Sequence, residues 1–363
     1  MLRRVLNRAA AGFDRMVAKT VLTRSKTSRA KSRAESLGPD ERAAALEAIR
    51  ESYDRPEHYA DPDTFFVPPM PAHPRTTHVR DIDGPSGRGE VLDLAWGSAF
   101  VPYEERIAAR YLEHERNRTA WARLLLHRDR PRPAAVLVHG YRSGQLALEE
   151  RVLPARWFFD RGLDVALFVL PFHGLRGERG RPRFPSSDPR FTNEGFRQAM
   201  FDLRALLRWF DAHGAPSAGA LGMSLGGYTV ALLSTIEPLA FVVPFIPLAS
   251  VADFARADDR FVGTAEQKAQ QHAALEAAHR VVSPLARPSL VAPDRALVLA
   301  AEGDRITPVS HARRLAAHLG AELETFTGGH LLQLGRSEAL RAVGRLLERA
   351  GLSERRLDRV ARS

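Results

Sequence analysis

The stretch that most constrains the fold of this chain is the run GALGMSLGGYTVALLS, residues 219–234. It reads as the end of a short strand, a serine flanked by glycines, and an apolar helix. Gly222 and Gly226 stand two residues before and two residues after Ser224, which gives the pattern G-x-S-x-G. A serine on a sharp strand-to-helix turn is held in a strained backbone conformation, so its surroundings must be nearly free of side chains. The pattern predicts a raised hydroxyl at the N-terminus of a helix, where N–H groups stabilise negative charge. An ordinary glycine turn is the alternative.

Composition sets the broad class of the protein. The 363 residues are 44% hydrophobic and 26% charged, which is typical of a globular chain with one large domain or two small ones. The absence of cysteine excludes disulfides, a cysteine nucleophile and thiolate metal sites. The longest apolar run, 239–249, is too short to cross a bilayer and contains two prolines. We therefore expect no transmembrane helix, no secretory signal, and a cytoplasmic protein that residues 1–34 could hold at a membrane surface.

The positive charge of the chain is concentrated at its N-terminus. Residues 1–34 contain ten basic residues and one acidic one, a net charge of +9 out of +10 for the whole chain. Apolar residues recur there at helical spacing, namely Leu2, Val5, Leu6, Ala9, Phe13, Met16, Val17 and Val21. Three readings remain open: a helix on an anionic membrane surface, a helix packed on the main domain before a solvated linker, and an organelle transit peptide. A nucleic-acid binder that works through this tail is an alternative class, but no reading surface or aromatic interleaving is apparent, so we do not expect nucleic acid as a partner.

Apolar runs and helical periodicities alternate along the rest of the chain. Expected strands lie at 78–82, 89–96, 134–138, 163–170, 218–221, 240–245, 296–301 and 322–326. Residues 118–127 read as either strand or helix, and the end of this segment favours a strand. Expected helices lie at 39–50, 153–160, 194–213, 225–233, 253–280, 311–319 and 336–350. This alternation predicts the α/β class, with a mostly parallel central sheet covered by helices on both faces. A proline-rich strap at 55–74 is expected to run over the surface.

Three residues follow expected strands in the order serine, acid, histidine. They are Ser224, Asp304 and His330. In a parallel sheet, groups that follow strands gather at one edge, so these three side chains are the candidate catalytic set. His330 would take the proton of Ser224 and Asp304 would hold the imidazole. Asp253, Asp258 and Asp259 are alternatives for the acid.

The chain resembles the α/β-hydrolase superfamily over about residues 75–350, in a serine esterase or lipase-like branch. The resemblance rests on His139-Gly140-Tyr141, on the G-x-S-x-G, on Glu302-Gly303-Asp304, and on Gly328-Gly329-His330. It implies hydrolysis of carboxylic esters through a Ser-His-Asp triad and an acyl-enzyme. It also assigns the oxyanion hole to the backbone N–H groups of Leu225 and Tyr141, with His139 and Gly140 supporting the loop. Within the domain of residues 75–350, a helical lid is expected at about 250–293. Residues 1–74 are expected to form an N-terminal extension with the strap, and residues 351–363 a C-terminal tail.

The segment 172–193 would lie above the serine and is rich in arginine. We take His173 and Arg176 as candidates to face the substrate, with His173 alternatively structural. Arg176, Arg179, Arg181, Arg183 and Arg190 could receive an anionic substrate, or could belong to a solvated loop. His311 and His318 are expected to be solvated rather than metal-binding, and neither a metal nor a cofactor is expected.

The expected partner is a small-molecule or lipid acyl ester. The residues do not distinguish an ester from a thioester or an amide. A non-catalytic scaffold of the same fold, which binds a ligand or a membrane surface, is the alternative function.

Overall fold

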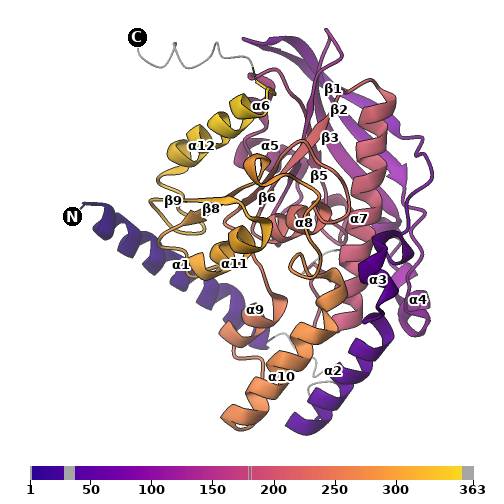
Figure 1. The fold of residues 1–363 in the computed structure, drawn as a ribbon, viewed down its shortest axis with the longest axis vertical. Helices are drawn as coiled ribbons and strands as arrows, with labels where there is room; N and C mark the ends of the chain where they lie inside the picture. The colour runs from indigo at the N-terminus through magenta and orange to yellow at the C-terminus, as the bar shows by residue number, and fades with distance from the viewer. Residues whose placement is uncertain (1, 28–36, 179, 181, 354–363) are drawn as a thin grey trace.

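A computed structural model describes residues 2–27, 37–178, 180 and 182–353. In this part of the chain the strands form one nine-stranded sheet with helices on both faces, as the sequence predicts (Figure 1). The strands are β1 Arg75–Gly84, β2 Gly87–Gly97, β3 Thr119–His127, β4 Ala134–Val138, β5 Asp164–Phe168, β6 Ala218–Met223, β7 Val242–Phe245, β8 Leu297–Ala301 and β9 Glu322–Phe326.

The order of the strands across the sheet is β1-β2-β3-β5-β4-β6-β7-β8-β9. The pairs β1–β2, β2–β3 and β3–β5 are antiparallel, and the remaining pairs, from β5 to β9, are parallel. The sheet is therefore mostly parallel, with an antiparallel edge formed by β1, β2 and β3. Every residue of β4 and β5 is buried, as expected for strands covered on both faces.

Twelve α-helices are described, and three of them were not expected. They are α1 Leu2–Thr27, α2 Pro39–Tyr53, α3 Glu57–Ala60, α4 Glu105–Leu112, α5 Leu146–Val152, α6 Ala155–Phe159, α7 Pro189–Ala212, α8 Leu225–Leu233, α9 Val251–Ala257, α10 Ala265–Ala278, α11 Val309–Leu319 and α12 Arg336–Arg349. The unexpected ones are α3, α4 and α5, which are too short to show a clear periodicity. The helix expected at 253–280 is two helices, α9 and α10, because Asp259 and Gly263 between them adopt positive φ values of 50° and 95°.

The two faces of the sheet carry separate hydrophobic cores. One core contains Phe196 and Leu203 of α7 and Tyr228 of α8. The other contains Phe158 of α6 and Leu346 of α12. Alternate residues of each buried strand point to opposite cores. This packing fixes the sheet edge at which the loops after β6, β8 and β9 meet.

The proline-rich strap runs over the surface, as expected, and is anchored in the core by two phenylalanines. Phe65 and Phe66 are fully buried, and the strap follows α7. Three arginines of α7 donate hydrogen bonds to its carbonyl groups: Arg197 to Phe65, Arg204 to Phe66 and Arg208 to Pro69. A proline-rich segment offers carbonyl oxygens without the matching N–H groups, and arginine donors satisfy them.

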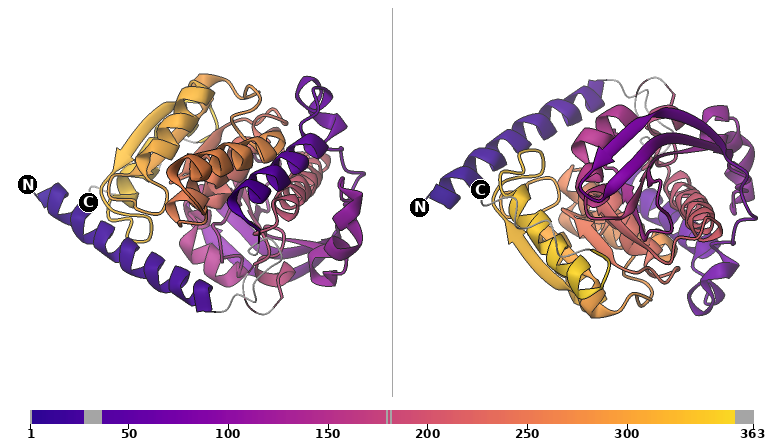
Figure 2. Two further views of the ribbon diagram at one scale, coloured as in Figure 1. Left: turned by 90° about the horizontal axis from the view of Figure 1, so that it is seen from below. Right: turned by 90° about the horizontal axis from the view of Figure 1, so that it is seen from above.

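The N-terminal extension packs on the sheet domain at two places. Helix α2 runs beside α10, where Leu46 joins a small core with Ala252, Phe261 and Leu275 (Figure 1). Helix α1 lies along one side of the molecule, beside the loops that follow β8 and β9 (Figure 2). Residues 250–293, the expected lid, contain α9 and α10, and α10 is the helix that contacts α2 of the N-terminal extension. None of the described helices is long and apolar enough to cross a membrane.

Candidate active site

Ser224 lies on the turn between β6 and α8, in a backbone conformation that few residues adopt. Its φ and ψ angles are 57° and −111°, a strained region for a residue with a side chain. A Cβ on Gly222 would lie 2.0 Å from the carbonyl oxygen of Gly226, and a Cβ on Gly226 would lie 2.2 Å from that of Val138. Both positions therefore require glycine, for the steric reason that the sequence pattern predicts.

Neighbouring backbone holds Ser224 from both sides. Its N–H donates to the carbonyl of Phe245 at 3.0 Å, and its own carbonyl accepts from the N–H of Leu248 at 3.1 Å. Its side chain is half-buried and makes no hydrogen bond with any residue in the described part of the chain. The hydroxyl therefore stands at the N-terminus of α8, held by its backbone and uncommitted.

Asp304 and His330 form a buried pair on the loops after β8 and β9. Nδ1 of His330 lies 2.7 Å from Oδ2 of Asp304, and the two residues are 8% and 3% exposed. A carboxylate can only accept, so Nδ1 carries the hydrogen and Nε2 keeps its lone pair. This tautomer is the one that a general base requires.

Two backbone N–H groups and a neighbouring hydroxyl surround the carboxylate of Asp304. The backbone N–H groups of Ile306 and Thr307 each donate to Oδ1 at 2.8 Å. The hydroxyl of Thr307 lies 3.0 Å from Oδ2 and 3.0 Å from Nδ1 of His330. Sequence reasoning missed Thr307. The signal was present in the pattern Asp304-Arg305-Ile306-Thr307, because a carboxylate that caps N–H groups two and three residues later is common before a helix.

The alternative acids lie elsewhere and have other partners. Asp253 pairs with His272 and Arg314, Asp258 with Arg260, and Asp259 with Lys268. The carboxylate that the structure brings to His330 is that of Asp304.

The two N–H groups assigned to the oxyanion hole lie on loops that meet at Ser224. Leu225 is the first residue of α8, and Tyr141 follows Gly140 after β4. A Cβ on Gly140 would lie 3.5 Å from Cβ of Ser224, so the 140–141 loop adjoins the serine. Neither N–H donates to an acceptor in the described part of the chain. Free N–H groups at a helix N-terminus suit a developing negative charge.

His139 holds this loop from below. Its Nδ1 atom lies 2.7 Å from the carbonyl oxygen of Gly140, and its Nε2 accepts from the N–H of Leu170 at 3.1 Å. Burial lowers the pKa of His139, so the ring is neutral and serves as one donor and one acceptor. Glu149, which the sequence did not single out, accepts from the N–H of Gly144 at 2.7 Å and is also buried.

The structure does not place Arg176 at a substrate surface, and that expectation is wrong. Its side chain is fully buried, with an ion pair of 2.7 Å to Asp202 of α7 and hydrogen bonds to the carbonyls of Val169 and Asn117. An arginine buried in a low-dielectric interior needs a carboxylate partner. The loop after β5 places Arg176 beside the carboxylate of Asp202. Sequence position alone put Arg176 near the serine, but the partner carboxylate comes from a distant helix.

His173 is also fully buried, which favours the structural reading. Its Nδ1 atom lies 2.8 Å from the carbonyl oxygen of Pro171, and its ring packs against those of His139 and Tyr141. Burial lowers the pKa of His173 to about 3. Of the other arginines in the segment, Arg183 faces Glu178 at 3.7 Å and Arg190 pairs with Asp188. Arg179 and Arg181 lie outside the described residues.

The two histidines of α11 were expected to be solvated, and this expectation is wrong. His311 is buried and accepts from the N–H of Ala249 at 3.2 Å, and burial lowers its pKa. His318 is half-buried, with Nε2 at 2.8 Å from the carbonyl of Arg287. Among the described residues, no cluster of three or more His, Asp or Glu side chains has the arrangement of a metal site.

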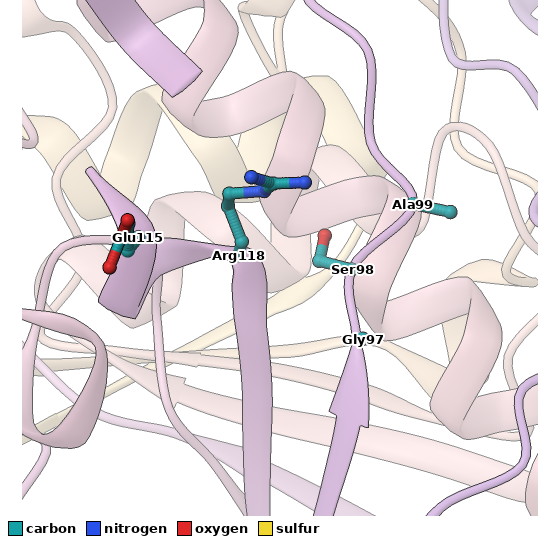
Figure 3. A pocket seen from close by; sticks show the side chains of 5 residues that line it. All are labelled: Gly97, Ser98, Ala99, Glu115 and Arg118. Carbon is teal, nitrogen blue, oxygen red and sulfur yellow. The ribbon is translucent and has the colours of Figure 1, made fainter. Parts of the chain in front are cut away.

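A surface depression of about 410 Å³ lies apart from these residues (Figure 3). It is lined by Gly97, Ser98, Ala99, Glu115 and Arg118, between the end of β2 and the start of β3. None of them belongs to the candidate site. The hydroxyl of Ser98 donates to Asp202, the partner of Arg176, so the floor of this depression is a structural network.

No family model and no curated protein sequence matches this chain. Solved structures do. An acetyl xylan esterase from Paenibacillus sp. R4 is 13% identical over 83% of this chain and 92% of that one, with a TM-score of 0.51. Acetyl xylan esterase 1 from Thermoanaerobacterium sp. JW/SL YS485 is 15% identical over 84% of this chain and 98% of that one, with a TM-score of 0.47. Est1E from Butyrivibrio proteoclasticus, solved with ferulic acid, is 14% identical over 64% of this chain and 95% of that one, with a TM-score of 0.46. The sheet order, the strained serine turn and the first of these likenesses together show that this chain has the α/β-hydrolase fold.

Proposed function

We propose that this chain is a serine hydrolase that cleaves carboxylic esters through Ser224, His330 and Asp304. The observation that carries the proposal is the strained Ser224 at the N-terminus of α8, on the same sheet edge as the buried Asp304–His330 pair. Strain of about 1–3 kcal/mol at such a position persists only where the surrounding structure enforces it, and it is typical of nucleophile turns. The likeness in fold to an acetyl xylan esterase favours an ester over an amide.

In the proposed reaction, Oγ of Ser224 attacks the acyl carbon while Nε2 of His330 takes the hydroxyl proton. The N–H groups of Leu225 and Tyr141 hold the resulting oxyanion. The proton then passes from His330 to the departing alcohol, and an acyl-serine remains. Water attacks this acyl group with His330 again as the base, and the carboxylic acid leaves. Asp304 stays ionised throughout and stabilises the imidazolium. A serine–histidine hydrogen bond of this kind commonly tightens when substrate binds.

The test is labelling with a fluorophosphonate and turnover of p-nitrophenyl acetate by the full chain. We expect the parent protein to be labelled and to turn over the ester, and Ser224→Ala to do neither. Turnover should also be lost in His330→Ala. Ser234→Ala is the matched control, because Ser234 is buried at the end of α8, where its hydroxyl donates to the carbonyl of Ala231 and accepts from the hydroxyl of Ser289. A correctly folded parent protein that is neither labelled nor active would favour the non-catalytic scaffold.

We further propose that the outward face of α1 binds an anionic membrane surface, which would make the protein peripheral on the membrane. Val5, Phe13 and Met16 are 54%, 36% and 59% exposed, although they are large and apolar. Arg4, Arg8 and Arg15 are exposed beside them on the same helix. An apolar stripe next to a row of arginines suits the boundary between acyl chains and anionic headgroups.

Sedimentation with lipid vesicles tests this second proposal. We expect the protein to bind phosphatidylglycerol-containing vesicles, and to bind pure phosphatidylcholine vesicles much less. The double variant Val5→Ser, Phe13→Ser should lose binding. Met70→Ser, at an 81% exposed position on the strap, should retain it. Equal binding by both variants would contradict the assignment to α1.

A further inference from the structure

Helix α1 docks on the sheet domain with its polar face. Asn7, Ala10 and Asp14 recur at helical spacing on the side that contacts the loops after β8 and β9. Ala10 and Asp14 are fully buried, whereas the apolar stripe with Val5 and Phe13 faces away. A helix that buries a carboxylate while it exposes its apolar stripe is held by specific contacts and not by hydrophobic burial alone.

The buried carboxylate of Asp14 binds the backbone of the histidine loop. Its Oδ2 accepts from the N–H of His330 at 2.7 Å, and its Oδ1 accepts from the N–H of Leu331 at 3.1 Å. The N–H of Arg305, which follows Asp304, lies 3.5 Å from the same Oδ2. One carboxylate on α1 therefore reaches the backbone beside both members of the acid–histidine pair.

The residue before each member of that pair is a glycine that makes room for α1. A Cβ on Gly329 would lie 2.5 Å from Oδ2 of Asp14 and 3.2 Å from the backbone carbonyl carbon of Ala10, and a Cβ on Gly303 would lie 2.6 Å from the carbonyl oxygen of Asn7. Backbone atoms of α1 cannot move aside as the end of a flexible side chain can. The two loops are thus shaped for a close approach of this helix.

We propose that Asp14 is a positioning residue for His330, so that the candidate site is complete only when α1 is docked. This inference rests on the proposed serine-hydrolase function. Hydrogen bonds from backbone N–H groups to a buried carboxylate are among the strong ones, and they hold the backbone of the loop on which the imidazole stands. Without the carboxylate, two buried N–H groups lose their acceptor and the loop is free to relax. A shift of about 1 Å in a catalytic group can lower the rate by about 10²-fold.

The experiment compares Asp14→Asn and Asp14→Ala with Asn7→Ala in the full chain. Asn7 is the matched control, because its side chain makes two hydrogen bonds to the same two loops, one to Glu302 and one from the N–H of Gly328. Its removal weakens docking without touching His330 or Leu331. For each protein we would measure kcat and KM with p-nitrophenyl acetate, the thermal midpoint, and hydrogen exchange of the 328–332 segment.

For the Asp14 variants we expect kcat to fall about 10- to 100-fold, KM to change less than about twofold, and exchange in the 328–332 segment to rise. Asn7→Ala should keep kcat within about threefold at a comparable loss of thermal stability. If all three variants lose activity in proportion to stability, the role of Asp14 is merely structural and the inference is overturned. Unchanged kcat in Asp14→Ala would overturn it as well. Inactivity of the parent protein is a separate result, because it contradicts the proposed hydrolase function instead.

Discussion

The hydroxyl of Thr307 lies 3.0 Å from Oδ2 of Asp304, and it also lies within hydrogen-bond distance of Nδ1 of His330 and of the carbonyl of Ile246. One buried hydroxyl therefore links the acid and the histidine to the loop after β7, next to the strand that carries Ser224. With a single hydrogen to donate, it can bond either to the Ile246 carbonyl or to the carboxylate, while its lone pairs face the ring N–H.

We expect Thr307→Val to lower kcat by about fivefold to tenfold with little change in KM, because one hydrogen bond of about 1 kcal/mol to the acid–histidine pair is lost. Steady-state kinetics on a soluble ester measures this. Thr325→Val, at an exposed position of β9 where the hydroxyl contacts Glu302, should leave kcat unchanged. An unaffected kcat in Thr307→Val would show that the backbone N–H groups alone suffice to hold Asp304.

Gly226→Ala should destabilise the fold by about 1–3 kcal/mol and slow fluorophosphonate labelling, because its new Cβ would collide with the carbonyl oxygen of Val138. Gly344→Ala on α12 is the matched change, since its Cβ would meet nothing closer than 3.8 Å. We expect that change to be neutral or stabilising by up to about 1 kcal/mol, because alanine favours a helix. Urea unfolding of both variants compares them, and equal midpoints would contradict the steric account of the serine turn.

The buried histidines make the protein sensitive to acid. Burial lowers the pKa of His173 to about 3 and that of His279 to about 4, whereas an unfolded histidine titrates near its ordinary value of about 6.5. The unfolded chain therefore binds more protons below about pH 6.5, and stability falls as the pH decreases through the window down to about 4.

For His173 alone the expected loss between pH 7 and pH 5 is about 2 kcal/mol. His173→Asn keeps a donor toward the Pro171 carbonyl but cannot titrate, so the difference in unfolding free energy between these two pH values should shrink by that amount. Denaturant unfolding at both pH values measures it. The same pH difference in variant and parent would show that His173 is accessible to protons in the folded state.

The pair Arg176–Asp202 should behave as a buried structural ion pair. Asp202→Asn leaves the arginine charge without its partner and should cost about 3–5 kcal/mol of stability. The double variant Arg176→Met, Asp202→Leu should recover much of that loss, and a double-mutant cycle gives the coupling energy. In the double variant, KM for a phosphate-bearing ester and for its neutral analogue should change in parallel. A selective rise in KM for the anionic ester would restore the substrate-facing role that the sequence suggested.

Docking of α1 changes what a truncation would do. From the sequence, removal of residues 1–34 would leave an enzyme able to hydrolyse soluble esters, because the basic stretch reads as a separate tail. In the structure, this removal also takes away Asp14, the acceptor for the N–H groups of His330 and Leu331. Loss of activity in a truncated chain would therefore not by itself indicate a binding function.

Local rules determined much of this protein from its sequence. Hydrophobic runs and their spacing predicted the strands of the sheet, because a strand buried on both faces must be apolar throughout. The glycines around Ser224 predicted the strained turn, because the space that this turn requires is provided by residues of the same short segment. The order of Ser224, Asp304 and His330 at strand ends followed from the rule that parallel strands end at one edge.

Tertiary structure decided the contacts between residues far apart in the chain. Which carboxylate meets His330, where the charge of Arg176 is neutralised, and which face of α1 is buried all depend on partners that lie tens or hundreds of residues away. The apolar stripe of α1 suggested a buried face, yet Asp14 and the small Ala10 dock on Gly329 instead, and Asn7 docks on Gly303. Close backbone approach and the satisfaction of buried N–H groups outweighed apolar area there, and neither has a periodic signature in the sequence.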